Sequence, residues 1–228
     1  MKHCIICLQE LDLFQGLKRE QLTDLCQCTQ RKRFCKGDYL FHQGEITSTI
    51  YLIKSGKLKL VQTDQEGHNT ILDICGPGEV LGEMSLYREQ NEPSSAIAME
   101  ELYACCFNKL QFESLIKRDP SFALRIIAYL GQKRYETLLR TGKETGLPVK
   151  ERLLQLFYRL AEEHGRTTPT ATLIDLKITQ QELAEMIGSS RVMVVQALKE
   201  LKAANIIGRE NKYFILKNDP CLSAHTFT

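Results

Sequence analysis

The hydrophobic pattern of this 228-residue chain changes its period near Asn108, and this change restricts the possible folds. Between Phe34 and Phe107, short apolar runs recur at intervals of about ten residues. Turn signals that contain glycine, such as Lys54-Ser55-Gly56, separate these runs. The pattern predicts short strands that close into a barrel or a double-sheet roll. Strands are predicted at 39–41, 50–53, 58–61 and 70–74.

After Asn108 the apolar residues recur every three or four positions, which predicts helices. A short helix is expected over 110–117. Asp119-Pro120 supplies an N-cap and a proline at the first helical position, so a long helix is expected over 121–141. Helical spacing also predicts one or two short helices over 11–28.

The long helix has two interpretations. It is either a core helix packed on its own barrel or one strand of a coiled coil between two copies of the chain. The two-fold symmetry of the DNA target inferred below favours the coiled coil. The predicted dimer contacts are Phe122, Ile126, Tyr129, Leu130 and Leu138.

Gly142, Gly146 and Pro148 all oppose helix, so a hinge and a domain boundary are expected here. The fold class is predicted as α+β, with a β-roll sensor over 1–118, a dimerisation helix and hinge over 119–146, and a third domain over 147–228. In this third domain a helix is expected over 149–164, followed by a loop or short strand over 167–176.

The segment Ile178–Leu201 has the features of two short helices joined by a tight turn. Thr179 and Glu182 have the spacing of a capping box, and Gly188 ends the first helix. Ser189 or Ser190 then caps a second helix, which turns Val194, Leu198 and Leu201 inward. This arrangement predicts a helix-turn-helix rather than an ordinary helical hairpin. A two-stranded wing is predicted over 204–209 and 212–216.

In a helix-turn-helix the second helix enters the major groove of DNA. Arg191 can pair with guanine and Gln196 with adenine, whereas Val192 and Met193 either touch a thymine methyl group or pack inside the protein. The start of the first helix is expected to meet a phosphate. The predicted DNA contacts are Thr179, Gln180, Gln181, Ser189, Ser190, Arg191, Val192, Met193, Gln196 and Lys199.

Short motifs along nearly the whole chain resemble the Crp/Fnr family of bacterial transcription regulators. They are Leu13-Phe14-Gln15-Gly16-Leu17, Gly37-Asp38, Gly44-Glu45, Tyr51-Leu52-Ile53-Lys54-Ser55-Gly56, Gly76-Pro77-Gly78-Glu79, Gly82-Glu83, Lys150-Glu151-Arg152-Leu153 and the helix-turn-helix. The resemblance implies a cyclic-nucleotide-binding-like β-roll, a long dimerisation helix and a winged helix that reads a palindrome in double-stranded DNA. It also implies a homodimer that works with RNA polymerase and is not an enzyme.

The chain departs from the family pattern at two places. The arginine that holds a cyclic phosphate in nucleotide-binding members falls on Ser94 here, although Arg88 could substitute. A cyclic nucleotide is therefore not the expected effector, and a cyclic-nucleotide-responsive regulator or binding module is kept as the alternative. The predicted effector pocket comprises Gly82, Glu83, Arg88, Ser94 and Ser95. In the recognition helix, Val192 and Gln196 replace the common Glu-x-x-x-Arg pair, so a different half-site is expected.

The nature of the signal stays open at the level of sequence. Cys4 and Cys7, together with Cys105 or Cys106, resemble the ligands of the iron–sulfur members of the family. A thiol redox switch, haem bound by His3, His42 or His68, and an organic ligand are the alternatives. Most of the nine cysteines are equally well explained as small buried hydrophobic residues.

Other classes of protein lack support in the sequence. Apolar runs are far shorter than the ~20 residues of a membrane span. No secretory signal is recognisable, so a cytoplasmic location is expected. No glycine-rich nucleotide loop, Ser/His/Asp set or His-rich metal motif indicates an enzyme. The net charge of +2 is too small to indicate nucleic-acid binding by itself.

Overall fold

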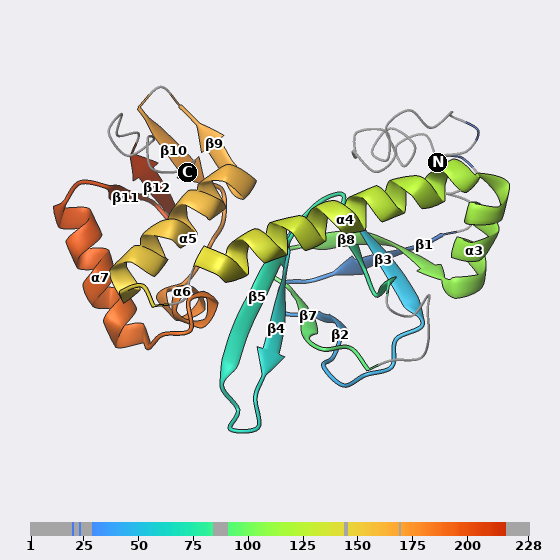
Figure 1. The fold of residues 1–228 in the computed structure, drawn as a ribbon, viewed down its shortest axis with the longest axis horizontal. Coiled ribbons are helices and arrows are strands. Elements are labelled where there is room, and N and C mark those ends of the chain that lie inside the picture. Colours follow the sequence, from blue (N-terminus) through green and yellow to red (C-terminus); the bar gives the residue numbers. More distant parts are fainter. Residues whose placement is uncertain are drawn as a thin grey trace. The chain divides into compact units, whose positions relative to one another are not determined.

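The computed structural model describes Glu20, Thr23 and residues 29–83, 91–143, 146–168 and 170–217. The chain forms two compact units, Met1–Leu139 and Arg140–Thr228, which are described separately below (Figure 1). Most of the segment 11–28, where helices are predicted, lies outside the described residues.

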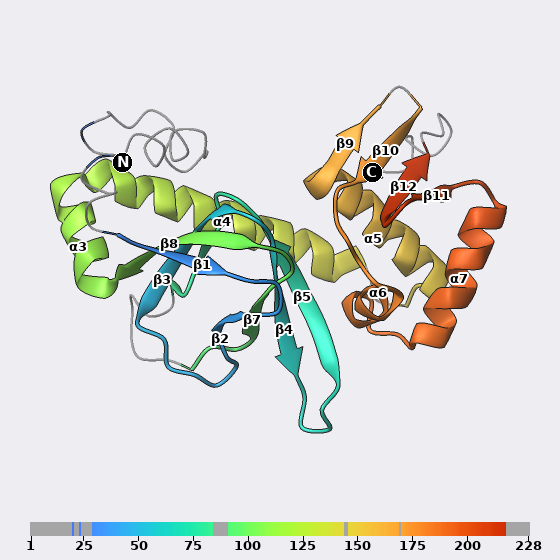
Figure 2. The same ribbon diagram turned by 180° about the vertical axis from the view of Figure 1, so that it is seen from behind.

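The described part of the first unit contains two four-stranded antiparallel sheets (Figures 1 and 2). In pairing order, one sheet consists of β1 (Gln30–Phe34), β8 (Leu102–Asn108), β3 (Thr49–Ser55) and β6 (Val80–Leu81). The other consists of β2 (Tyr39–Phe41), β7 (Ser95–Ala98), β4 (Leu58–Thr63) and β5 (Asn69–Cys75). The predicted double-sheet roll and its four predicted strands are confirmed.

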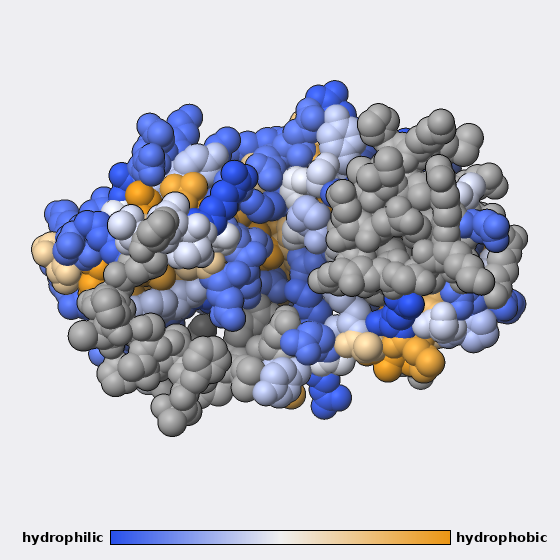
Figure 3. Space-filling model, turned by 90° about the horizontal axis from the view of Figure 1, so that it is seen from above, coloured by the Kyte–Doolittle hydropathy of each residue, from blue (hydrophilic) through white to orange (hydrophobic). Residues whose placement is uncertain are grey.

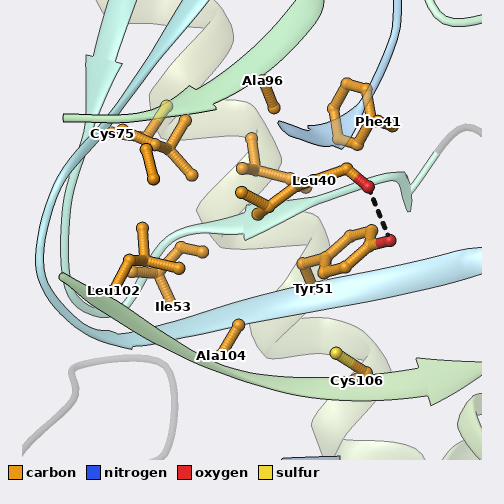
Figure 4. Close-up of a cluster of buried hydrophobic side chains, with 12 residues drawn as sticks. Leu40, Phe41, Tyr51, Ile53, Cys75, Ala96, Leu102, Ala104 and Cys106 are labelled. Carbon is orange, nitrogen blue, oxygen red and sulfur yellow. Dashed lines mark hydrogen bonds between the residues drawn. The ribbon is translucent and has the colours of Figure 1, made fainter. Parts of the chain in front are cut away.

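A cluster of buried side chains fills the inside of the roll (Figure 4). Both sheets contribute side chains that are 0% exposed. Leu58 comes from β4 in one sheet, and Ile53 and Leu102 come from β3 and β8 in the other. The Tyr51 hydroxyl, which lies among them, donates to the Leu40 carbonyl oxygen at 2.9 Å. Because that hydroxyl has a partner, its burial does not carry the cost of a lost hydrogen bond.

Two glycines allow backbone segments to approach each other in the roll. A Cβ atom on Gly82 would lie 2.3 Å from the Thr49 carbonyl oxygen, and the φ of Gly82 is +75°. A Cβ atom on Gly56 would lie 2.3 Å from the Glu101 carbonyl oxygen, at a φ of +81°. Both positions therefore require glycine on steric and on conformational grounds.

Two helices follow the roll, α3 (Lys109–Arg118) and α4 (Pro120–Lys143). The carboxylate of Asp119 accepts from the backbone N–H of Ser121 at 3.1 Å, as expected for an N-cap. Helix α4 continues past Gly142 to Lys143, and the next described helix begins at Val149, so α4 ends within the break predicted over 142–148 but one residue later than its start. A single glycine near the end of a helix weakens it without interrupting its hydrogen bonds.

One face of α4 packs on its own unit. Phe122 and Ile126 are buried, and the Phe122 ring lies 5.8 Å from the Phe112 ring of α3. The Tyr129 hydroxyl accepts from the backbone N–H of Val80 at 3.2 Å. Phe122, Ile126 and Tyr129, which we expected at a dimer interface, therefore do not lie on the exposed face of α4. Their apolar surface is already covered by the sensor unit.

The other face of α4 is exposed and apolar. It presents Leu124, Ile127, Leu130 and Leu138, with exposed fractions of 68%, 65%, 38% and 61%. Figure 3 shows that hydrophobic residues gather in a surface patch at the lower right of that view. Among the described residues, no helix combines the length and the apolar character that crossing a membrane requires.

The second unit combines three helices with one antiparallel sheet (Figure 1). Its described helices are α5 (Val149–His164), α6 (Gln180–Met186) and α7 (Arg191–Ala203). The sheet has the order β11 (Ile207–Glu210), β12 (Tyr213–Lys217), β10 (Ala171–Ile174) and β9 (Gly165–Thr167). The first of these helices has the predicted bounds, 149–164.

The sheet of the second unit is larger than the predicted two-stranded wing. Strands β9 and β10 form a hairpin where a loop or a single strand was expected, and β10 also pairs with β12. In this pairing Ile174 lies opposite Phe214, whose ring is 5.1 Å from that of Phe157 in α5. The pairing depends on contacts between distant segments, which local sequence does not reveal.

The close approach at Gly82 leads to a stability prediction. We expect Gly82→Ala to lower the free energy of unfolding by about 3 kcal/mol, because the new Cβ meets backbone and the conformation is left-handed. Gly188→Ala is the control, since Gly188 has a φ of +58° but open space where its new Cβ atom would lie. That control should cost only about 1 kcal/mol in urea unfolding. Equal losses in the two variants would contradict this account.

Candidate nucleic-acid interface

Reciprocal hydrogen bonds define the start of α6. The Thr179 hydroxyl oxygen accepts from the backbone N–H of Glu182 at 3.1 Å, and the Glu182 carboxylate accepts from the backbone N–H of Thr179 at 2.9 Å. This is the capping box that the sequence predicts. It fixes the residue at which α6 begins.

A left-handed glycine and a serine cap connect α6 to α7. Gly188 has a φ of +58°, and the next backbone N–H, that of Ser189, donates to the Ala184 carbonyl oxygen at 3.0 Å. The Ser190 hydroxyl oxygen then accepts from the backbone N–H of Met193 at 3.3 Å, so Ser190 is the N-cap of α7. The turn predicted at Gly188 is confirmed.

Helix α7 has one buried face and one exposed face. Its buried face consists of Val194, Ala197, Leu198 and Leu201, each at most 5% exposed. Leu183 and Ala184 of α6 are buried as well, as expected where two helices cross closely. This packing fixes the rotation of α7, so the side chains of the intervening residues point to solvent.

The predicted base-contacting residues lie on that exposed face. Arg191, Gln196 and Lys199 are exposed, and in the described part of the chain the Arg191 side chain has no hydrogen-bond or ion-pair partner. Val192 and Met193 are 79% and 53% exposed. Of the two interpretations that the sequence left open for these apolar residues, packing inside the protein is therefore wrong.

A chain of polar contacts orients Gln196. The Gln196 side-chain amide donates to the Glu200 carboxylate at 3.3 Å, and Lys150 of α5 lies 3.6 Å from the same carboxylate. The amide keeps a second N–H and its carbonyl oxygen for a base, which is the set that adenine requires. Sequence reasoning missed Glu200 and Lys150. The i, i+4 spacing of Gln196 and Glu200 is a signal that could have identified the first.

The start of α6 has fewer free donors than expected. The backbone N–H and hydroxyl of Thr179 both donate to the Glu182 carboxylate, each at 2.9 Å. Gln180 is partly buried, and the exposed Gln181 donates to Glu185 at 3.1 Å. A phosphate placed here would have to compete with the Glu182 carboxylate for the donors of Thr179.

Basic side chains near the β11–β12 turn add cationic groups that the sequence pattern did not single out. Lys177 lies 6.0 Å from the centre of the Tyr213 ring, and Arg209 lies 5.3 Å from the centre of the Phe214 ring. Lys212 is exposed in the turn between the two strands. Cations on aromatic faces are held in place while they stay available to a phosphate.

In the sensor unit, the predicted effector residues lie among carboxylates. Ser94 is 4% exposed, and the Ser95 hydroxyl oxygen accepts from the backbone N–H of Gln43 at 2.9 Å. Burial raises the pKa of Glu83. Gly82 lies at the close approach described above, and Arg88 lies outside the described residues.

The nearby Glu92 is 7% exposed, and its pKa is raised to about 7, first by burial and then by the charges of Glu83 and Glu45. The charges of two other carboxylates therefore act on Glu92, and negative charge at this place opposes an anionic phosphate.

The described cysteines do not provide a cofactor site. Cys4 and Cys7 lie outside the described residues, and Cys105 is 0% exposed in the centre of a sheet. Burial raises the pKa of Cys106 to about 11, and it also raises that of Cys75 well above the usual value. Their thiolates, the forms that bind metals and react, are thus disfavoured.

Within the described ranges, no group of three His, Cys, Asp or Glu residues could hold a metal ion. His42 stacks on Tyr39 at 4.1 Å, and His68 lies 3.3 Å from the Asp64 carboxylate. The described residues consequently do not provide the set of ligands that an iron–sulfur cluster requires.

Comparison with known protein families matches both units. A model of the cyclic nucleotide-binding domain matches residues 31–119, and a model of the Crp-like helix-turn-helix domain matches residues 151–223. Together these ranges contain the roll and the α6–α7 pair described above.

Individual proteins are similar over most of the chain. The CRP-like cAMP-activated global transcriptional regulator of Mycobacterium tuberculosis is 26% identical over 216 residues, or 95% of this chain and 96% of that protein. The cyclic AMP receptor protein of Thermus thermophilus is 29% identical over 195 residues, or 86% of this chain and 87% of that protein.

A solved structure, the c-di-GMP-responsive global regulator CLP of Xanthomonas campestris, superposes with a TM-score of 0.76 at 21% identity, covering 89% of this chain and 100% of that one. At this level of identity the likeness concerns the fold.

The raised pKa of Glu92 predicts how stability depends on pH. Between pH 4.5, the usual pKa, and about pH 7 the folded chain binds more protons than the unfolded chain, so stability falls as pH rises through this window. We expect Glu92→Gln to be more stable than the parent protein by about 2 kcal/mol at pH 8 and equally stable near pH 4.5.

Urea unfolding between pH 4.5 and pH 8 measures this difference. Glu66→Gln is the matched control, because the Glu66 side chain is 80% exposed in the same unit. A gain in stability from Glu92→Gln that does not change with pH would show that the ionisation of Glu92 is not its cause.

Proposed function

This chain belongs to the Crp/Fnr family of DNA-binding transcription regulators, and we propose that it binds a palindromic operator in double-stranded DNA as a homodimer. This proposal is supported mainly by the distribution of side chains around α7, which has one buried face and one exposed face. Its apolar face is buried, and Arg191, Val192, Gln196 and Lys199 project from the opposite face. An exposed helix of this kind fits the major groove.

In the proposed complex α7 enters the groove with its N-terminal end first. Arg191 binds a guanine through two hydrogen bonds, and Gln196 binds an adenine in the orientation that Glu200 supports. Lys199, further along α7, and Lys212 in the β11–β12 turn meet phosphates. Promoter DNA bound in this way would bring the regulator next to RNA polymerase, which we propose as its partner.

The exposed face of α4 supports the homodimer. Leu124, Ile127, Leu130 and Leu138 repeat at the spacing of a helical seam and are too exposed to contribute to the core of their own unit. A second α4 packed on this face would bury them and give two copies of α7 related by two-fold symmetry. Two such helices suit half-sites about one DNA turn, or roughly 34 Å, apart.

The anchoring of α4 on the roll suggests how a signal reaches the DNA. The Lys133 side chain forms an ion pair with Glu79, and the Tyr129 hydroxyl accepts from the backbone N–H of Val80. Two side chains of α4 therefore contact consecutive residues at the start of β6. We propose that an effector in the roll shifts these residues and thereby the packing of the two α4 helices. The segments 1–118, 119–146 and 147–228 would act as sensor, dimerisation helix with hinge, and reader.

Two classes of effector remain to be distinguished. The carboxylates of Glu45, Glu83 and Glu92 disfavour a cyclic phosphate, which supports a redox, gas or other small-molecule signal. The names of the relatives from Mycobacterium tuberculosis and Thermus thermophilus favour the alternative, a cyclic-nucleotide-responsive regulator. Calorimetric titration of the full chain with cAMP decides between them.

The role of Arg191 yields a direct test. Arg191→Ala should reduce the preference for the operator over unrelated DNA by about 1–3 kcal/mol, because a bidentate guanine contact is lost. The operator is first selected from a random library with the full chain, and gel shifts at fixed salt then measure both affinities.

Arg31→Ala removes the same charge from an exposed position on β1 and is the matched control. This control should leave the preference unchanged. If Arg191→Ala and Arg31→Ala weakened binding to the operator and to unrelated DNA alike, Arg191 would not be reading a base.

The dimer proposal predicts the effect of a charge on α4. Ile127→Asp should shift the chain to monomer and weaken operator binding by about 100-fold or more, because an unpaired carboxylate would be buried at the seam. Sedimentation velocity measures the assembly state. Leu110→Asp, at a position 75% exposed on α3, is the control and should stay dimeric. An Ile127→Asp chain that sediments as a dimer would refute this interface.

A further inference from the structure

Val192 is the most exposed of the large hydrophobic side chains in the described part of the chain, at 79%. It lies in the first turn of α7, between Arg191 and Met193. With most of its surface exposed, this side chain contributes little to the packing of its own unit. In the free protein it only adds water-exposed apolar surface, which is unfavourable.

Met193 differs from its neighbour in its contacts. The Ser189 hydroxyl lies 3.9 Å from the Met193 sulfur, so this side chain is directed back toward the turn that precedes α7. Its exposed fraction is correspondingly lower, at 53%. Val192 is thus the apolar group of this turn that stays free to meet a partner.

The neighbours of Val192 on α7 define where that partner lies. Val192 and Gln196 are four residues apart and occupy the same face of the helix. Because valine is branched at Cβ, its methyl groups have little rotational freedom to lose on binding. Val192 consequently presents a rigid apolar surface next to a side chain that can read a base.

The chemistry of the groove restricts the partner of Val192 to one group. Valine has neither a donor nor an acceptor, and the only apolar group that a base edge presents in the major groove is the C5 methyl of thymine. A G·C pair at this place would leave its polar edge atoms without partners, at a cost in affinity. Hence only an A·T pair gives Val192 a favourable contact.

Resting on the DNA-binding function proposed above, we infer that Val192 selects a thymine through its C5 methyl group, beside the base pair that Gln196 contacts. The half-site therefore contains an A·T pair at this position, and its recognition depends on the methyl group rather than on a hydrogen bond. This property distinguishes the chain from a regulator with an acidic residue at the same place, which would accept a hydrogen bond from cytosine.

The test begins with the operator selected by the full chain from a random library. Each thymine of one half-site is then replaced in turn by deoxyuridine, which lacks only the methyl group. One position should weaken binding about four-fold, and replacement in both half-sites should weaken it about 16-fold, as expected for one buried carbon per half-site.

Variants connect that position to Val192. Val192→Ala should bind the thymine and deoxyuridine operators nearly equally at this position, whereas Leu110→Ala, at an exposed apolar position on α3, should keep the full difference. Both side chains are largely exposed, so both variants should melt within a few degrees of the parent protein, and thermal unfolding verifies this.

Each other outcome has a definite meaning. An operator whose affinity is insensitive to deoxyuridine, or a full difference that persists in Val192→Ala, would overturn the inference and leave the DNA-binding proposal intact. A selection that enriches no sequence would overturn the proposed function itself.

Discussion

The packing of α4 on the sensor roll is the constraint on which the proposed mechanism depends. Phe122 and Ile126 bury one face of the helix, and Tyr129 and Lys133 connect it to the segment around β6 through a hydrogen bond and an ion pair. Burial alone would lower the pKa of Lys133, but the hydrogen bond and charge of Glu79 outweigh it and raise the pKa. The ammonium group therefore stays charged and the ion pair persists at neutral pH. The opposite, apolar face of the helix is left available to a second copy.

The exposed face of α7 is held in a fixed position by the caps and the packing of the two helices. The capping box of α6, the left-handed Gly188 and the Ser190 cap determine where each helix begins, and the buried face of α7 determines its rotation. The reading side chains need no further ordering of the backbone when DNA binds, which lowers the entropic cost of association. The cationic groups at and near this surface are local, since the overall charge of the chain is only +2.

The sensor unit combines a filled interior with an unusual electrostatic environment. Side chains from both sheets occupy the centre of the roll, and the raised pKa values of the buried Cys75 and Cys106 disfavour their thiolates. The charges of Glu83 and Glu45 add to the effect of burial and raise the pKa of Glu92 to about 7, so Glu92 can change its ionisation near neutral pH.

The sequence by itself determined the local features of this protein. The strand periods, the Asp119-Pro120 start of α4, the bounds of α5 and the caps of α6 and α7 all follow from neighbouring residues, because caps, turns and amphipathic periods are short-range effects. The residues expected on the recognition helix are exposed as predicted, although their roles stay predictions.

Only the tertiary structure decided which side of an amphipathic element is covered. Periodicity placed Phe122, Ile126, Tyr129, Leu130 and Leu138 on one helix without showing that the first three pack on the roll while Leu130 and Leu138 face outward. It likewise could not show that β10 joins β12 in one sheet or that Glu200 orients Gln196. These facts arise from contacts between residues far apart in the chain, where burial and pairing energies override local preference.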